Sequence, residues 1–232
     1  MGHLHILTKD VEAHRKLWVD TLGAKVVKAG PVEFYQFPGV VVALRKGEPN
    51  AGTDGSVVDH LGFKVKDLDM AKAKLTAAGG QVVREMPDTR QMFIMFPDGV
   101  KVEFTEDKAL EQPVVHHHIH FATPEIEPMR AWYAEKFGAV LGMRGRFKAA
   151  DVPGVNLSWN PADQPLATTK GRGLDHIGFE VTGLEEFCKK LEAAGVKFDV
   201  PFRKVPQLGL SIAFLTDPWG TYIELTEGLG KL

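Results

Sequence analysis

Apolar and polar residues alternate along this chain in a way that predicts short strands and amphipathic helices in a repeating order. Strand-like runs such as residues 57–65 and 100–105 are rich in apolar and β-branched side chains. Between such runs apolar residues recur at helical spacing, as they do over residues 184–194. Gly23 and Gly79 stand where two of the predicted helices end. We therefore expect an α+β protein.

The order of a strand, a helix and then further strands occurs four times, twice in each half of the chain. The first half is expected to contain strands at 3–8, 33–37, 40–44, 57–65, 81–85, 92–96 and 100–105, with helices after Asp10 and at 68–78. The second half repeats this order, with helices near 127–137 and 184–194. We expect two domains, residues 1–108 and 114–232, joined by a linker at 109–113.

Two histidines and a glutamate recur in phase in the two halves. The first half contains His3, His60 and Glu103, and the second contains His118, His176 and Glu224. The corresponding residues are 115, 116 and 121 positions apart, so the repeat contains only small insertions. The surrounding sequence repeats as well, since Asp-His-Leu-Gly-Phe at 59–63 matches Asp-His-Ile-Gly-Phe at 175–179.

Such a triad predicts a metal site. Two imidazoles and one carboxylate can hold a divalent ion and leave coordination positions open. Glu103 stands between two apolar residues, so strand alternation places its carboxylate on the face opposite to theirs. A carboxylate enclosed in this way needs a partner, and a metal is a natural one. The donor set suits iron, manganese, zinc, nickel or cobalt, and the sequence does not select among them.

Further polar residues lie in register with the triads. Residues i and i+2 of a strand share a face, so His5 accompanies His3 and His120 accompanies His118. We interpret His5 and His120 as acid/base groups or substrate contacts, with hydrogen-bonded core histidines as the alternative. By the same argument Tyr222 lies beside Glu224 and could orient or protonate a substrate.

Four other residues carry simpler expectations. Lys101 occupies the place beside Glu103 that corresponds to Tyr222 in the second half. His116 and His117 have no counterparts in the first half, and we expect them to be exposed residues next to the linker. Cys188 falls on the apolar face of the last predicted helix and is interpreted as a core residue rather than a nucleophile.

Composition narrows the class of protein. A chain of 232 residues can bury a substantial core, and 44% hydrophobic with 25% charged residues is ordinary for a globular protein. The net charge of −2 gives no reason to expect nucleic acid or a membrane surface as partner. One cysteine excludes an internal disulfide framework, and no signal peptide is recognised, so the cytoplasm is the default location.

Taken in order, these motifs resemble those of the vicinal oxygen chelate superfamily, which includes glyoxalase I, extradiol dioxygenases and bleomycin-resistance proteins. The resemblance rests on a histidine in the first strand, on aromatic residues in the first helix (Trp18; Trp132-Tyr133) and on a Leu-Gly or Phe-Gly pair that ends this helix (22–23; 137–138). It rests further on the Asp-His-x-Gly-Phe motif and on a closing Pro-Asp-Gly-x-x-x-Glu motif at 97–103, which recurs in variant form at 217–224. It implies four βαβββ units, paired so that each pair forms a curved mixed sheet around a metal-binding cup. The units could pair within each half or be swapped between the halves, and both arrangements give two complete triads.

The resemblance also implies a small, metal-chelating oxygenated substrate and a monomer or homodimer. Glyoxalase I takes a fourth metal ligand from the last strand of the first unit, where this chain has Ala43 and Asn156. This departure places dioxygenase chemistry ahead of a glyoxalase-type lyase or isomerase, although Phe214 stands where extradiol enzymes have an acid/base tyrosine. We expect the second half to be catalytic, with Tyr222 and His120 near its metal. A bleomycin-resistance-type binding protein is the non-enzymatic alternative, which two retained triads disfavour.

Overall fold

The computed structural model describes residues 1–232 and contains four βαβββ units. Unit 1 comprises β1 (His3–Thr8), α1 (Val11–Arg15) continued by the π-helix η1 (Lys16–Thr21), β2 (Lys25–Ala29), β3 (Val32–Phe37) and β4 (Val40–Lys46). Unit 2 comprises β5 (Val58–Val65), α2 (Leu68–Ala77), β6 (Gln81–Met86), β7 (Gln91–Phe96) and β8 (Val100–Glu106), with the 3-10 turns η2 (Pro87–Thr89) and η3 (Pro97–Gly99).

The second half repeats these units. Unit 3 comprises β9 (Val114–Thr123), α3 (Ile126–Phe137), β10 (Val140–Arg144), β11 (Phe147–Val152) and β12 (Val155–Pro161). Unit 4 comprises β13 (Leu174–Glu180), α4 (Leu184–Ala193), β14 (Phe198–Val205), β15 (Leu210–Thr216) and β16 (Tyr222–Glu227), with the 3-10 turns η4 (Pro206–Leu208) and η5 (Leu229–Lys231). The predicted order of elements is confirmed, except that β2 is a strand the sequence analysis did not predict.

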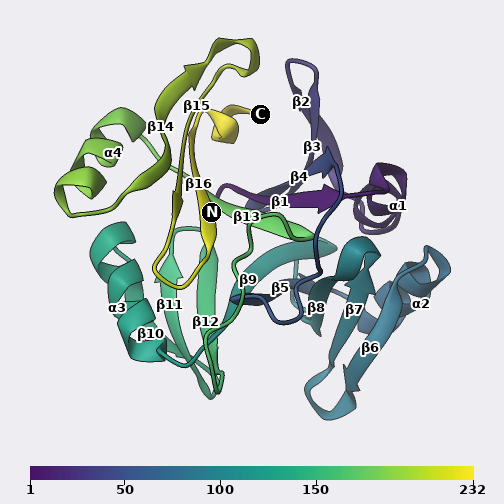
Figure 1. Ribbon diagram of the computed structural model, residues 1–232. Helices are drawn as coiled ribbons and strands as arrows, with labels where there is room; N and C mark the ends of the chain where they lie inside the picture. Colours follow the sequence, from purple (N-terminus) through teal and green to yellow (C-terminus); the bar gives the residue numbers. More distant parts are fainter.

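The four units form two curved, mixed sheets of eight strands each (Figure 1). Sheet 1 has the order β14-β15-β16-β13-β1-β4-β3-β2 and combines units 4 and 1, whereas sheet 2 has the order β10-β11-β12-β9-β5-β8-β7-β6 and combines units 3 and 2. The swapped arrangement is therefore the one adopted. The segment at 109–113 joins β8 to β9, which belong to the same sheet. We call the concave faces of the two sheets cup 1 and cup 2.

Local sequence explains where α1 and α2 begin. The Asp10 carboxylate accepts a hydrogen bond from the backbone N–H of Ala13, and the Asp67 carboxylate accepts one from that of Met70. Each aspartate thus satisfies a donor at a helix start that has no partner within the helix. Both caps follow directly on a central strand, so they fix the direction in which the chain leaves the sheet.

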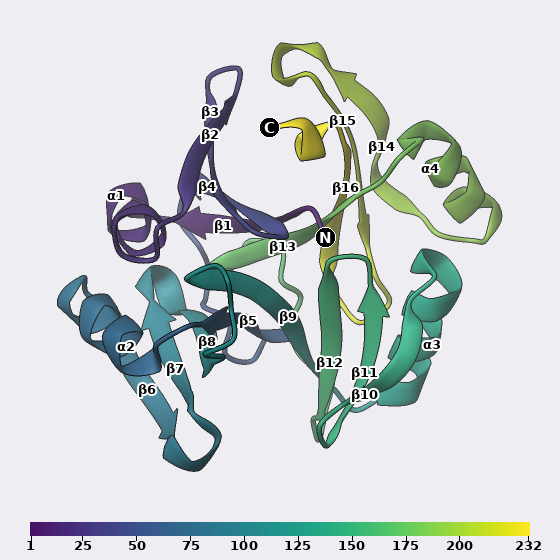
Figure 2. The same ribbon diagram turned by 180° about the vertical axis from the view of Figure 1, so that it is seen from behind.

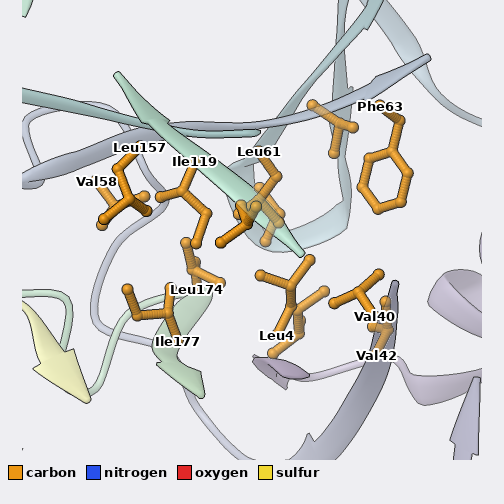
Figure 3. Packing of buried hydrophobic residues seen from close by; sticks show 14 of the residues in the cluster. Leu4, Val40, Val42, Val58, Leu61, Phe63, Ile119, Leu157, Leu174 and Ile177 are labelled. Carbon is orange, nitrogen blue, oxygen red and sulfur yellow. The ribbon is translucent and has the colours of Figure 1, made fainter. Parts of the chain in front are cut away.

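The convex faces of both sheets share one core. Leu4 pairs with Ile177 across β1 and β13, and Leu61 pairs with Ile119 across β5 and β9. These four side chains are fully buried and lie between the two sheets in Figure 3. Burial of each is worth about 1.5–3 kcal/mol. Because each flanks a predicted metal ligand in sequence, the same strand alternation that builds this core turns the ligands to the opposite face.

The helices pack in the other combination, within each half of the sequence. Figures 1 and 2 show α1 beside α2 and α3 beside α4. Trp18 contacts Phe96 of unit 2 with ring centroids 4.7 Å apart, and Tyr133 of α3 donates a hydrogen bond of 2.9 Å to Asp217 of unit 4. Helix packing therefore joins the two units of each half, and the shared sheets join the two halves, so all four units are tied together.

Two smaller expectations concern the helices. Cys188 is buried on α4, and burial raises its thiol pKa to about 11, as expected of a core residue. None of the helices combines the length and apolar character needed to cross a membrane.

Candidate metal centres

The central strands carry histidines to both cups. His3 and His5 lie on the concave face of β1, and His118 and His120 lie on that of β9, because each pair is two residues apart. The antiparallel partner strands contribute one histidine each, since His5 is paired with His176 and His120 with His60. Three histidines therefore converge in each cup from two adjacent strands.

In cup 1 the predicted ligands from units 1 and 4 meet. His3 Nε2 lies 2.9 Å from Glu224 Oε2, and His176 Nε2 lies 3.0 Å from the same oxygen. His3 and His176 are buried and Glu224 is almost completely so. The triad of cup 1 is therefore His3, His176 and Glu224.

In cup 2 the ligands come from units 2 and 3. His60 Nε2 lies 2.9 Å from Glu103 Oε2, and His118 Nε2 lies 3.5 Å from that oxygen and 3.4 Å from His60 Nε2. All three side chains are buried. Both predicted triads are thus assembled, each from residues of both halves of the chain.

A third histidine stands within reach of each triad. The donor atoms of His5 lie within 4.8 Å of those of the cup 1 triad, and His120 has the same relation to the cup 2 triad. Nε2 of His5 and Nε2 of His120 are buried and have no hydrogen-bond partner. Such groups are uncommon in folded proteins and call for an explanation such as an ion or a ligand.

The spacing of these donors fits a divalent metal. Around an ion with bonds of about 2.1 Å, neighbouring donors lie about 3 Å apart and opposite donors about 4.2 Å apart. The separations of 2.9, 3.4 and 3.5 Å in cup 2 fall in this interval. A set of imidazoles and one carboxylate is also chemically suited to divalent transition metals.

Two aspartates that the sequence analysis quoted only as part of a motif orient one histidine in each cup. Asp59 Oδ1 lies 2.6 Å from His60 Nδ1, and Asp175 Oδ1 lies 2.6 Å from His176 Nδ1. A carboxylate on one ring nitrogen directs the other toward the metal. In the sequence, this role is indicated by the position of each aspartate directly before a ligand histidine.

Cup 2 supports its ligands more fully than cup 1. Gln91 Nε2 and Thr105 Oγ1 donate to Glu103 Oε1 at 3.0 and 2.9 Å, which leaves Oε2 facing the histidines. His117 Nδ1 lies 3.0 Å from His118 Nδ1, whereas His3 Nδ1 in cup 1 has no partner. The outer contacts that hold metal ligands in place are therefore more complete in cup 2.

The expectation that His116 and His117 are exposed linker residues is wrong. Both lie in β9, where His116 is 5% exposed and packs edge-on against Phe63 at 5.1 Å. The strand register shifts between Gly62 and Phe63, and this irregularity turns His116 toward the core. His117 is half-buried and contacts His118.

Charges in the two centres follow from burial and close contacts. Burial, the largest influence, raises the pKa of Glu103, but its hydrogen bonds with His118 and His60 outweigh this and hold that pKa well below the usual range. Burial likewise raises the pKa of Glu224, and contacts with His3 and His176 reverse the direction. Both glutamates are thus carboxylates, the form that binds metal.

The additional histidines are neutral. Burial is the main cause in both cases, lowering the pKa of His120 to about 3 and that of His5 well below its usual value. An imidazole without charge can ligate a metal or exchange hydrogen bonds with a bound molecule.

The expectation that Tyr222 and His120 flank one metal is wrong, because the swapped sheets separate them. Tyr222 lies in cup 1, where its ring stacks on Phe214 at 5.2 Å and meets His176 edge-on at 5.5 Å. Burial raises the Tyr222 pKa to about 12, so the phenol is protonated. In cup 2 the corresponding Lys101 is paired with Asp59 at 2.9 Å and with Asp54 at 2.7 Å.

The residue expected at the fourth-ligand position of unit 1, Ala43, also needs correction. Asn156 lies beside His118 in the parallel pair of β12 and β9, and the residue in the same relation to His3 is Val41. Ala43 lies beside His5 instead. Valine cannot ligate a metal, so cup 1 lacks this ligand.

Cup 1 is lined by apolar side chains and covered by the C-terminal turn η5. Leu229 is 5% exposed and packs into a cluster formed by Ala29, Phe34, Val41, Ala43, Leu210 and Ile212. Glu180 holds this turn by accepting hydrogen bonds from the backbone N–H groups of Gly228 and Gly230 at 2.7 and 3.2 Å. Figure 1 shows the C-terminus between β15 and β3.

Cup 2 instead presents polar side chains beside its triad. A recess of about 400 Å³ is lined by residues that include His117, Arg144, Asp151 and Asn156. The corresponding recess of cup 1 measures about 200 Å³ and is lined partly by Leu229. Cup 2 therefore offers more space and more hydrogen-bonding groups to a small molecule.

Comparison with known proteins shows to which family the chain belongs. The family model described as Glyoxalase/Bleomycin resistance protein/Dioxygenase superfamily matches twice, over residues 1–104 and 116–225. Lactoylglutathione lyase of Haemophilus influenzae is 25% identical over 124 residues, which are 46% of this chain and 92% of that protein.

Solved structures support the fold. Glyoxalase I from Zea mays superposes with a TM-score of 0.76 at 16% identity, covering 97% of this chain and 91% of that one. A Bacillus subtilis protein provisionally named a dioxygenase superposes with a TM-score of 0.69 at 12% identity, covering 97% and 84%. Since both identities are low, this likeness is one of fold.

Proposed function

Since this chain belongs to the Glyoxalase/Bleomycin resistance protein/Dioxygenase superfamily, we propose that it is a metal-dependent lyase of the glyoxalase type whose substrate binds in cup 2. The observation that carries the proposal is the convergence of His60, His118 and Glu103. A polar recess adjoins this triad through His117 and Asn156, which are neighbours of His118. A metal held by a buried triad next to space for a small molecule is the usual arrangement of a catalytic centre.

The comparisons reverse the order of the two chemistries that the sequence suggested. The sequence favours dioxygenase chemistry because Ala43 and Asn156 depart from the residue type that glyoxalase I has as its fourth ligand. A curated relative named lactoylglutathione lyase favours glyoxalase-type chemistry instead. The missing ligand no longer counts against it, since the cup that has Val41 in that place is not the one to which we assign the substrate.

Cup 2 is preferred to cup 1 because its recess is larger and its ligands are better supported. Leu229 covers the apolar interior of cup 1, whereas Arg144 and Asn156 leave cup 2 polar. An oxygen-rich substrate needs hydrogen-bond partners, and an apolar wall leaves its polar groups unpaired. Cup 1 is then a metal site of structural character.

The substrate class follows from the name of that relative. Cleavage of lactoylglutathione at its carbon–sulfur bond yields a thiol and a 2-oxoaldehyde, so we propose the thiol adduct of a 2-oxoaldehyde as substrate. Its conversion to a 2-hydroxy thioester moves one proton between adjacent carbons and one between the two adjacent oxygens, and it needs no external oxidant or reductant. A divalent ion bound to His60, His118 and Glu103 would polarise the two adjacent substrate oxygens.

The residues of cup 2 then have separate tasks. Glu103 is the carboxylate of this cluster, and Oε2, the oxygen not held by Gln91 and Thr105, faces the cup. Being ionised, it can accept the proton from one carbon and return it to the other while Oε2 is not engaged by the ion. Asp59 keeps the His60 ring in place while this happens.

The test combines metal analysis with an anaerobic assay. Protein purified without added metal is analysed for bound ions, and thioester formation from methylglyoxal and glutathione is followed by ultraviolet absorbance without oxygen. We expect turnover, a loss of at least about 100-fold in the His118→Ala/Glu103→Ala variant, and activity close to wild type in the matched cup 1 variant His3→Ala/Glu224→Ala.

Other results would overturn this function. Oxygen uptake with a catechol, together with no anaerobic thioester formation, would establish the dioxygenase alternative. Tight binding of a small ligand without turnover in either assay would favour the binding-protein alternative. Loss of activity in the cup 1 variant alone would move the catalytic site to the other cup.

A further inference from the structure

Arg144 contacts the third histidine of cup 2 and thereby fixes where its proton lies. Nη2 of Arg144 is 3.1 Å from Nδ1 of His120. A guanidinium is always protonated and only donates, so Nδ1 of His120 must be the acceptor. A neutral imidazole carries one proton, and here that proton lies on Nε2.

Arg144 is itself held by a chain of hydrogen bonds. Its Nε donates to Ser158 Oγ at 2.8 Å, and Ser158 Oγ donates to Asn156 Oδ1 at 2.6 Å. Asn156 Nδ2 in turn donates to Asp151 Oδ1 at 2.8 Å. The guanidinium also lies 5.3 Å from the centre of the Phe147 ring, on which it rests. These contacts leave Arg144 little freedom to turn away from His120.

The protonated nitrogen of His120 has no lone pair with which to bind a metal. Nε2 is buried and has no hydrogen-bond partner, and one ring nitrogen of His120 lies within 4.8 Å of the donor atoms of His60, Glu103 and His118. Because Nδ1 is held by Arg144, we assign Nε2 as the nitrogen that faces these donors. An N–H group has no lone pair for an ion, so it needs an acceptor instead. An oxygen of a molecule bound to the metal would occupy that position and satisfy the buried donor.

Cup 1 provides a natural comparison, because it has the histidine without the arginine. His5 occupies the place of His120, paired with His176 as His120 is paired with His60. The strand registers place Ala29 where Arg144 stands, and they place Ala43 and Val41 where Ser158 and Asn156 stand. None of these three side chains can donate or accept a hydrogen bond. The hydrogen-bonded chain is therefore specific to cup 2.

We infer that His120 donates a hydrogen bond from Nε2–H to an oxygen of the metal-chelating substrate, and that Arg144 is the positioning residue that enforces this tautomer. This assignment rests on the proposed function, since it adds a substrate contact to the site of cup 2. The donor stabilises negative charge that develops on the substrate oxygen during proton transfer. It distinguishes His120 from the metal ligands His60 and His118.

The first test reads the tautomer directly. Protein labelled with ¹⁵N-histidine is examined, without metal and with zinc, in a long-range ¹H–¹⁵N spectrum that shows which ring nitrogen of His120 carries the proton. We expect protonated Nε2 and unprotonated Nδ1 in both states. Arg144→Met should shift His120 toward the other tautomer, whereas Arg144→Lys should retain the wild-type pattern. A proton on Nδ1 in the wild-type protein would overturn the assignment.

The second test uses acetohydroxamate, a bidentate oxygen chelator, as the probe. Its affinity for the zinc-loaded protein is measured by calorimetry in a His176→Ala/Glu224→Ala background, so that only cup 2 binds metal. His120→Ala should retain one zinc per chain and bind the probe about tenfold more weakly, the loss of one hydrogen bond. His120→Gln, which keeps an N–H donor, should recover most of that affinity.

A variant of the other cup serves as the control for this test. His5→Ala in the same background should leave probe affinity unchanged, because it alters the other cup. Loss of zinc in His120→Ala would make His120 a ligand, and unchanged probe affinity would remove its contact with the bound molecule; either result overturns the assignment. If tautomer and probe results are as expected but no substrate turns over, the proposed function fails and the assignment stands.

Discussion

Gly62 lies opposite His118 in the antiparallel pair of β5 and β9, and any side chain at Gly62 would occupy the space of the His118 ring. Gly178 has the same relation to His3 in the other sheet. Gly62 has no unusual backbone angle, so its requirement comes from the neighbouring strand. The glycine of the repeated Asp-His-x-Gly-Phe motif is therefore part of the candidate metal centre.

Gly62→Ala should displace the His118 ring and disable cup 2. Because the ring is buried and closely surrounded, we expect a loss of about 1–3 kcal/mol in the free energy of unfolding and the loss of one bound metal per chain. Metal content and thermal unfolding measure the two effects. Gly142→Ala is the matched control, because a Cβ there meets nothing within 4 Å. Full metal content in Gly62→Ala would contradict this role.

The triads could be predicted from sequence because each ligand occupies the same position in two copies of one unit. His60 and His176 lie in the same motif, and the alternation of apolar and polar neighbours indicates which face each occupies. The pairing of units could not be predicted, since His3 completes a triad with either partner set. Contacts between segments more than 170 residues apart decide it, such as that between His3 and Gly178.

The errors have local causes. The absence of first-half counterparts to His116 and His117 suggested an exposed segment, but the register shift beside Gly62 turns His116 into the core. Ala43 is the expected counterpart of Asn156, whereas the strand register gives Val41, which also lies 115 positions before Asn156, the offset between His3 and His118. A bulge such as the one at Gly62 leaves no clear mark in the hydrophobic pattern.

Asp59→Asn should weaken metal binding in cup 2 by about 10–100-fold, the usual cost of losing a carboxylate that orients a ligand histidine. The fold should remain intact, because asparagine is nearly the same size. Metal affinity is measured by competition with a chelating dye.

Two variants give this prediction its controls. Asp54→Asn removes the other carboxylate that contacts Lys101 but leaves His60 untouched, so metal affinity should not change. Asp175→Asn should weaken the site in cup 1 alone. An equal loss of metal affinity in Asp54→Asn and Asp59→Asn would show that the ion pairs with Lys101, and not the contact of Asp59 with His60, support the site.

His14 should make the protein less stable in mild acid. It is fully buried in α1 and lies 3.2 Å from the carbonyl oxygen of Pro97, and burial lowers its pKa from 6.5 to about 4. The unfolded chain therefore takes up a proton at a higher pH than the folded one. Stability should fall as the pH drops below about 6.5, and by pH 4 the loss reaches about 3 kcal/mol.

Urea unfolding at pH 7 and pH 4 with a metal chelator present measures this loss. His14→Gln cannot titrate, so its stability should decrease by about 3 kcal/mol less between the two pH values than that of the wild-type protein. Parallel losses in the two proteins would show that His14 is not the group responsible.

Paired substitutions distinguish the swapped cups from cups formed within each half. In the swapped fold His3 and His176 belong to one site, so His3→Ala/His176→Ala should retain one metal per chain in cup 2. His3→Ala/His60→Ala removes one ligand from each cup and should weaken both sites, since two of the three triad ligands hold an ion poorly. Cups formed within each half would give the opposite result for the two variants. Elemental analysis after dialysis against a weak chelator measures the number of metal ions per chain. Both variants carry two histidine-to-alanine changes, so they differ only in the sites that they affect.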